Sequence, residues 1–235
     1  YGVAYDQSGN ILVSGFTWCS DFPITTGAAQ TSHIGYGGDA FVIKFNPLGT
    51  RLWATFLGGE KGDWGYGIST DSGGDIITTG VTASDSFPIT PGAFQTIPST
   101  FRVFVTKLNS SGSIIIWSTF LGEGRGHGVA IDKDDNVFIS GPTVAPTFPV
   151  TSCAFQTVYG GGNYDHYISK LDKNGSLLAS TFVGGPRQDD IYGTQVVALY
   201  KGYVYMTGLT RNFGGPAGAS AYYGYSYPVT TGAFQ

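Results

Sequence analysis

One stretch of nine residues occurs four times in this chain, and it constrains the fold more than any other feature. Each copy begins with an aromatic residue and proline, continues through Ile or Val to Thr, and ends in Gln; the copies are residues 22–30, 87–95, 148–156 and 227–235. Self-similarity at a long period is typical of tandem structural repeats, because each copy marks one supersecondary unit. We therefore divide the chain into repeats at about 1–64, 65–126, 127–191 and 192–235, the last incomplete.

Each full repeat contains two pairs of short apolar runs joined by turn residues. In the first repeat, residues 2–6 and 11–15 flank a turn at 7–10, and residues 40–45 and 51–57 flank a turn at 46–49. Runs rich in β-formers and separated by Asp, Asn and Gly predict β-hairpins. We name the four predicted strands of a repeat a, b, c and d in chain order.

Four antiparallel strands per repeat predict an all-β fold, a β-propeller of four-stranded blades with strand a innermost and no helix beyond a turn or two. The composition agrees, with 37 glycines, 15 tyrosines and only 12% charged residues. A sandwich of separate hairpins is the alternative, but sandwiches do not repeat their loops. Three full repeats and part of a fourth predict a piece of a larger ring, whose fourth blade takes strands c and d from further sequence or a neighbouring molecule.

The repeated motifs resemble the bacterial β-propeller repeat family, the SBBP repeats. The resemblance covers essentially the whole chain and rests on the nine-residue stretch together with Gly2-Val3-Ala4-x-Asp6, Ser14-Gly15-x-Thr17, Asp39-Ala40-Phe41-Val42-x-Lys44 and Thr55-Phe56-Leu57-Gly58-Gly59. It implies a propeller in a secreted or cell-surface protein, usually as one module of a larger polypeptide, and it implies no single activity. The fourth repeat departs from the pattern, since residues 193–197 lack the Asp and residues 211–226 form an insertion.

Charge and hydropathy narrow the classes of partner. The net charge of −4 argues against nucleic-acid binding, and no apolar run approaches the roughly 20 residues of a membrane span. We expect no cofactor, and we expect protein subunits, further repeats of the same polypeptide or a glycan as partners. Cys19 and Cys153 occupy non-equivalent repeat positions, which leaves open a bridge or two separate thiols. Asn109 and Asn174 begin glycosylation sequons, but both also fall in predicted c–d turns, where Asn is common.

Antiparallel order places the tight a–b and c–d turns at one end of each sheet and the long b–c and d–a segments at the other. Function concentrates on such long segments, so we expect the partner at this loop-rich end. The predicted partner-binding residues are Trp18, Trp64, Arg211, Tyr222, Tyr223 and Tyr225. The last four lie in the insertion, where the alternative is that the tyrosines cover the fourth blade. One repeat position is shared by Tyr1, Tyr66, His127 and Tyr192, which indicates packing around the axis, with a ligand role as the alternative.

No catalytic residue and no metal ligand is predicted. The chain lacks nucleophile-elbow, phosphate-loop and zinc-protease motifs. The run Asp132-x-Asp134-x-Asn136 resembles the start of a calcium loop, but it lacks the glycine at the sixth place and fits a plain hairpin turn. We favour a non-enzymatic binding or structural module. The competing hypothesis is a carbohydrate-active enzyme that uses acidic residues of the loop-rich end, namely Glu60, Asp63, Glu123, Asp189 and Asp190.

Overall fold

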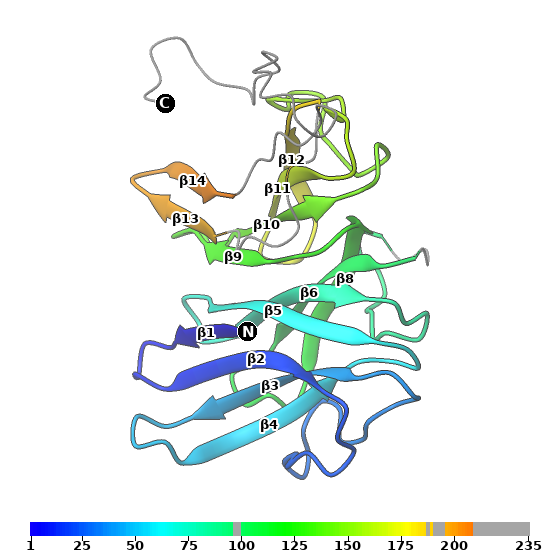
Figure 1. Cartoon of the computed structure of the whole chain (residues 1–235). Coiled ribbons are helices and arrows are strands. Elements are labelled where there is room, and N and C mark those ends of the chain that lie inside the picture. Colours follow the sequence, from blue (N-terminus) through cyan, green and yellow to red (C-terminus); the bar gives the residue numbers. More distant parts are fainter. Residues whose placement is uncertain (96–99, 187–188, 190–195, 209–235) are drawn as a thin grey trace, which may run out of the picture.

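The computed structural model describes residues 1–95, 100–186, 189 and 196–208 (Figure 1), and within them every regular element is a β-strand. The first sheet contains β1 (Gly2–Tyr5), β2 (Ile11–Thr17), β3 (Asp39–Phe45) and β4 (Arg51–Leu57). The second contains β5 (Asp63–Thr70), β6 (Ile76–Thr82), β7 (Arg102–Leu108) and β8 (Ile115–Glu123). The third contains β9 (Gly128–Ile131), β10 (Val137–Thr143), β11 (Asp165–Leu171) and β12 (Leu177–Val183). A hairpin of β13 (Val196–Tyr200) and β14 (Tyr203–Thr207) follows.

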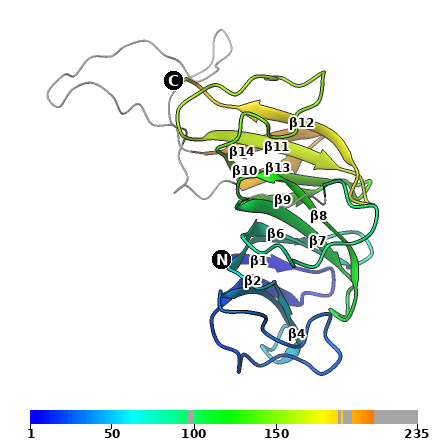
Figure 2. The same cartoon turned by 90° about the vertical axis from the view of Figure 1, so that its right-hand side faces the viewer.

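The strands of each sheet follow chain order and are antiparallel throughout, which confirms the a-b-c-d blades of a β-propeller. The register repeats as well, because the pairing of strands c and d shifts at the same place in every blade, after Lys44, Lys107 and Lys170. Figures 1 and 2 show the blades following one another along the chain. The first strands β1, β5, β9 and β13 contact one another in turn, which confirms that strand a is innermost. The strands β1 and β5 approach each other closely, because a Cβ on Gly2 of β1 would lie 2.2 Å from the carbonyl oxygen of Tyr66 of β5.

The hydrophobic core lies between the faces of adjacent blades. Between the first and second blades, Leu12, Val42 and Trp53 pack in one cluster with residues of the second blade, namely Ile68, Ile76 and Leu108. Between the second and third blades, the equivalent residues Ile77, Val105 and Trp117 pack with Val129, Val137 and Leu171. Burial of this apolar area is the main stabilising contribution, and each blade is stable only because its neighbour covers its face.

The nine-residue stretch covers the outer edge of its own blade. In the first blade the amide of Thr25 donates to the carbonyl of Ala54 (3.0 Å), and the amide of Phe56 donates to the carbonyl of Gln30 (3.1 Å). The second and third blades repeat both bonds. Strand d is the outermost strand, and an uncovered edge strand pairs readily with other chains, so the stretch protects that edge.

The course of this stretch corrects the prediction that b–c segments stay at the loop-rich end. Each of the three described stretches leaves that end and runs along strand d, and in the first copy the amide of Ala29 reaches the carbonyl of Gly112 (2.9 Å) in the c–d turn of the next blade. The first aromatic residue of each described stretch packs on an aromatic ring of strand c in its own blade. The distances between ring centroids are 4.6 Å for Phe22, 4.6 Å for Phe87 and 4.2 Å for Phe148. The aromatic residue thus holds its own loop in these three copies; the fourth copy lies outside the described residues.

The two cysteines are free and exposed, so they form no bridge. Asp132 accepts hydrogen bonds from the amides of Asp134 (3.0 Å) and Asn136 (2.9 Å), which confirms the plain hairpin turn at this position.

Candidate functional site

Six aromatic side chains form a continuous row at the loop-rich end, around the innermost strands. We call them the aromatic row: Tyr1, Phe16, Trp18, Trp64, Tyr66 and His127. Phe16 is central. Its ring centroid lies 4.7 Å from that of Trp18, 5.6 Å from that of Tyr1 and 6.2 Å from that of Trp64.

Tyr66 extends the row toward the third blade. Its ring centroid lies 5.5 Å from that of Tyr1 and 4.9 Å from that of His127, both at steep angles between the ring planes. Edge-to-face and offset contacts of this kind are the favourable geometries for aromatic pairs. The row therefore joins three successive blades at their inner strands into one rigid surface.

Strand geometry explains how these rings come together. Phe16 lies on β2 and Trp18 directly follows it, and residues two apart on a strand project from the same face. Trp64 lies near the start of β5, and a Cβ on Gly62 would lie 2.4 Å from its ring, so only glycine leaves room for the indole there. Tyr1, Tyr66 and His127 meet because they share one repeat position next to the axis.

The row combines exposure with electrical neutrality. Trp18 is 67% exposed and Tyr1 is 77% exposed. Burial lowers the pKa of His127 to about 4, and the positive charge of Arg125 contributes, so the imidazole is neutral near pH 7. Burial also raises the pKa of the Tyr66 hydroxyl, although Arg125 opposes the shift. The rings of the row are thus uncharged near pH 7, and the cation of Arg125 lies beside Tyr66 and His127.

The structure brings together two of the predicted partner-binding residues, Trp18 and Trp64, through Phe16, which sequence reasoning missed. The i, i+2 spacing of Phe16 and Trp18 is the signal that could have identified it. Packing of Tyr1, Tyr66 and His127 around the axis is confirmed by their mutual contacts, and Tyr1 remains exposed as well. Arg211, Tyr222, Tyr223 and Tyr225 lie outside the described residues, and so do Asp190 and Tyr192.

Two carboxylates lie together beneath the loop-rich end of the first and second blades. Asp39 Oδ1 and Asp63 Oδ2 both lie 2.8 Å from the point where a Cβ on Gly58 would stand, so the two side chains are close neighbours. Neither has solvent-exposed surface. Burial raises the pKa of Asp63 to about 6, and the negative charge of Asp39 adds to the shift. Burial raises the pKa of Asp39 too.

The same arrangement recurs where the third blade ends. Asp189 Oδ2 accepts a hydrogen bond from the amide of Gly185 (2.8 Å), as Asp63 Oδ2 does from Gly59 (2.8 Å). Burial raises the pKa of Asp165 to about 6, and the charge of Asp189 contributes. Both carboxylates are buried. These pairs belong to the blade interfaces, because a carboxylate without exposed surface cannot reach a substrate.

Two further acidic residues of the predicted set, Glu60 and Glu123, lie at the loop-rich end. Glu60 accepts hydrogen bonds from the hydroxyl of Ser86 and from the amides of Asp85 and Ser86, and these bonds lower its pKa well below the usual range. Glu123 ends β8.

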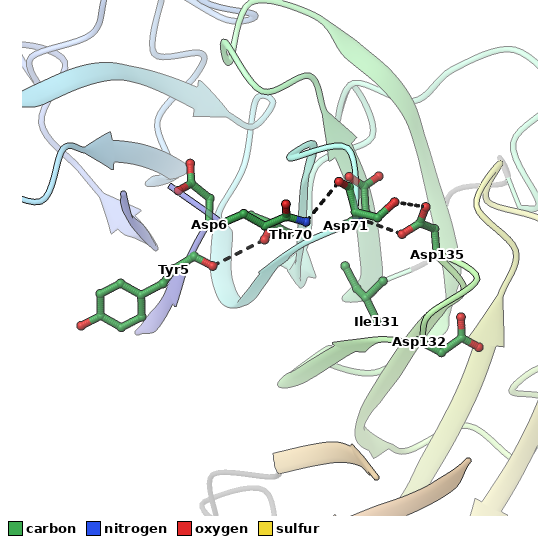
Figure 3. A pocket seen from close by; sticks show the side chains of 9 residues that line it. Tyr5, Asp6, Thr70, Asp71, Ile131, Asp132 and Asp135 are labelled. Carbon is green, nitrogen blue, oxygen red and sulfur yellow. Dashed lines mark hydrogen bonds between the residues drawn. The ribbon is translucent and has the colours of Figure 1, made fainter. Parts of the chain in front are cut away.

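A cavity of about 300 Å³ opens at the opposite, tight-turn end (Figure 3). Its carboxylates come from the ends of the three innermost strands, and each is paired: Asp6 with Lys44, Asp71 with Lys107 and Asp132 with Lys170. Asp135 binds the amide and hydroxyl of Ser72. These groups already have partners within the protein, so the cavity offers a ligand little free polar chemistry.

The described residues show no metal cluster and no membrane-spanning helix. Among residues 1–95, 100–186, 189 and 196–208, no group of three or more His, Cys, Asp and Glu is placed to hold a metal ion. That part also contains no helix with the length and apolar character of a membrane span.

Comparison with known proteins supports β-propeller repeats in general and does not single out one repeat family. No model of a known protein family matches the chain. An uncharacterised WD repeat-containing protein of Acanthamoeba polyphaga mimivirus is 27% identical over 142 residues, which cover 55% of this chain and 10% of the relative. The chain thus spans about a tenth of that protein's length. The likeness agrees with β-propeller repeats and fits a binding or structural module.

Proposed function

We propose that this chain is a non-enzymatic, extracellular or cell-surface binding module of the SBBP type, and that its aromatic row holds a neutral glycan. The observation that carries the proposal is the row itself. Five aromatic rings contact one another in sequence from Trp18 to His127 across three blades, and Trp64 joins them at Phe16. Trp18 and Tyr1 are open to solvent.

The chemistry of the row suits sugar rings. Tyrosine and tryptophan combine a broad apolar face with a polar group, so the C–H face of a sugar can stack on the ring while its hydroxyls find a hydrogen-bond partner. The rings already pack against one another, so binding immobilises few side chains and costs little entropy. The rings themselves are uncharged, since His127 is neutral near pH 7, so the contact that they offer a ligand is stacking and not ion pairing.

The length of the row favours an oligosaccharide over a single sugar, since ring contacts continue from Trp18 to His127. The extracellular or cell-surface location is proposed on the resemblance to SBBP repeats. No observation favours the competing enzymatic hypothesis, because the carboxylates that lie together, Asp39 with Asp63 and Asp165 with Asp189, are buried.

A glycan array probed with the labelled full chain tests the proposal, followed by calorimetric titration of the best neutral oligosaccharide. We expect Trp18→Ala to weaken binding at least about ten-fold without changing the melting temperature, because the indole is exposed. The matched control is Leu48→Ala, a 91% exposed residue of the tight-turn end, which should bind like wild type. Absence of any neutral glycan among the ligands, or unchanged affinity of the Trp18 variant, would overturn it.

A further inference from the structure

The c–d turn of the third blade presents an asparagine to solvent. Asn174 stands directly before the glycine of that turn, where the first and second blades have Leu48 and Ser111. All three residues are exposed. Leu48 is 91% exposed although the second blade follows it, and the second blade, which carries Ser111, has a neighbour on each side. Exposure at this place is therefore a property of the turn in every blade.

The fold of this turn does not use the Asn174 side chain. Oδ1 of Asp172 accepts the backbone amides of Asn174 (2.9 Å) and Ser176 (2.8 Å). The amide of Gly175 donates to the carbonyl of Asp172 (3.0 Å). Among the described residues, the carboxamide of Asn174 has no hydrogen-bond partner. A group attached to this carboxamide would therefore leave the bonds of the turn intact.

Asn174, Gly175 and Ser176 form a sequon for N-glycosylation, Asn-x-Ser with x other than proline. The modification attaches a bulky sugar to the asparagine amide, so it needs a position at the surface. Ser176 is exposed as well, and its hydroxyl has no partner in the part of the chain that the structure describes. Both polar side chains of this sequon are thus accessible.

The other sequon of the chain, at Asn109, is held inside its turn. Oδ1 of Asn109 accepts the amides of Ser113 (2.9 Å) and Ile114 (3.2 Å), and Nδ2 donates to the hydroxyl of Ser113 (3.1 Å). The hydroxyl of Ser111, the third residue of this sequon, lies 2.9 Å from that of Ser113. Asn109 has the structural role that Asp172 has in the third blade, so its carboxamide is not free.

A hollow of about 420 Å³ beside Asn174 provides room for the first sugars of a glycan. Its walls are residues 90–93 of the nine-residue stretch, residues 116–119 of β8, and Asn174 with Gly175. In the first blade the stretch closes onto the following turn through the bond from Ala29 to Gly112. The equivalent residues Phe94 and Gly175 are both described and make no such bond, so the hollow stays open.

We propose that Asn174 is the attachment site of an N-linked glycan on this chain, and that Asn109 is not. Nδ2 of Asn174 forms a bond to the anomeric carbon of a lipid-linked oligosaccharide. The bond from that carbon to the diphosphate of the lipid breaks, and the lipid diphosphate leaves with the proton that Nδ2 loses. The proposal rests on the secreted or cell-surface location in the proposed function, because sequons are used in secreted proteins.

Enzymatic transfer to the folded full chain tests this site. The chain is incubated with a purified oligosaccharyltransferase and a lipid-linked oligosaccharide, and intact mass with peptide mapping locates the product. A synthetic peptide of residues 170–178 is the positive control for the enzyme. Ser176→Ala removes the sequon of Asn174. The matched variant Ser111→Ala removes the sequon of Asn109, and both variants keep their asparagine.

Trp18→Ala separates this test from that of the proposed function. Trp18 lies in the aromatic row at the loop-rich end, whereas Asn174 lies in a c–d turn at the opposite end. The variant should therefore accept the glycan like wild type while it binds array glycans weakly. Failure of array binding would leave the transfer result unchanged, and failure of transfer would leave array binding unchanged.

We expect one glycan per chain, on Asn174, and none on Asn109. Ser176→Ala should lose the mass increase completely, and Ser111→Ala should keep it. The melting temperature of the glycosylated chain should equal that of the unmodified chain, because the Asn174 carboxamide makes no bond to other described residues. Modification of the peptide without modification of the folded chain, a glycan on Asn109, or a mass increase that survives Ser176→Ala would overturn the proposal.

Discussion

The Nζ of Lys107 lies 2.6 Å from Oδ2 of Asp71, so an ion pair joins the third strand of the second blade to the end of its first strand. The first and third blades repeat the pair, with Lys44 2.9 Å from Asp6 and Lys170 3.1 Å from Asp132. The other oxygen of Asp71 accepts the amides of Gly73 (3.0 Å) and Asp75 (2.9 Å). The Asp71 carboxylate thus stabilises the a–b turn through two backbone amides and binds strand c of the same blade through Lys107.

Loss of this lysine should destabilise the protein strongly. Lys107→Met leaves the Asp71 carboxylate in a site where its side chain is only 5% exposed, and an uncompensated buried charge of this kind costs about 3 kcal/mol in the free energy of unfolding. Lys133→Met is the matched control, since its side chain is 86% exposed and solvent screens its pair with Asp134, so the variant should unfold like wild type. Urea unfolding measures both, and equal effects would contradict the structural role of the pair.

Removal of Trp117, which lies between the second and third blades, should also lower the free energy of unfolding. Trp117 is buried in the interface between the second and third blades, so Trp117→Ala should lower the free energy of unfolding by about 3–5 kcal/mol. Trp117→Phe keeps most of the apolar contact and loses the hydrogen bond to Lys173, for about 1–2 kcal/mol. Differential scanning calorimetry distinguishes the two variants. A Trp117→Ala melting temperature as high as that of Trp117→Phe would show that the interface does not depend on the indole.

The pH dependence of stability should reveal the buried pair Asp39–Asp63. Burial raises the pKa of Asp63 in the folded protein to about 6, above its usual 3.8, so the folded state binds the proton more tightly than the unfolded state. The stabilising contribution of the proton bound by Asp63 is therefore complete below about pH 4, and it is lost as the pH rises through about 6. At neutral pH the ionised group costs about 3 kcal/mol, from a shift of about two pKa units.

Asp63→Asn should accordingly be more stable than wild type at neutral pH, by up to about 3 kcal/mol, and the difference should vanish near pH 4. The amide oxygen can still accept the hydrogen bonds of Gly59 and Ser84. Urea unfolding at several pH values measures the difference. Asp134→Asn, at an exposed residue, should follow wild type throughout. If the free energies of unfolding of Asp63→Asn and of wild type changed in parallel with pH, the pKa of Asp63 would not be raised in the folded protein.

The nine-residue stretch should stabilise the folded protein and should also protect the edge of strand d against aggregation. Phe87 is 2% exposed and packs on Phe104 and Phe120, so Phe87→Ala should cost about 3–4 kcal/mol and free the edge of β8. Light scattering at elevated temperature should then rise earlier than in Phe155→Ala, which changes an exposed ring of the third copy. Similar scattering for the two variants would argue that the stretch leaves the edge unprotected.

The blades could be predicted because local signals agree at every repeat. Asp6 at the end of one apolar run and Asn10 before the next specify the same turn that Asp132 and Asn136 specify in the third blade. The course of the nine-residue stretch could not be predicted, because the partners of its repeated Thr and Gln, such as Ala54 for Thr25 and Gly58 for Gln30, are known only once strand d is placed beside the stretch. The prediction that the ring needs further strands stays a prediction.

The candidate site was predicted in part. Trp18 and Trp64 were expected to bind a partner, but Phe16, which joins them, looks like an ordinary strand residue until the strands are placed. The pairing of Asp39 with Asp63 was missed because the two carboxylates come from different blades and meet only over Gly58. Ala179 stands where the first two blades have Trp53 and Trp117, and only the register of the β-pairing shows this equivalence.

Saturation-transfer NMR with a neutral oligosaccharide tests most directly whether the aromatic row binds glycans. The prediction is transfer from the protein to the ring C–H protons of the sugar, because those protons stack on the aromatic faces. The transfer should disappear in Trp18→Ala and in Phe16→Ala, and it should persist in Leu48→Ala at the opposite end. Transfer that survives in both aromatic-row variants would contradict the proposal and place the glycan elsewhere on the molecule.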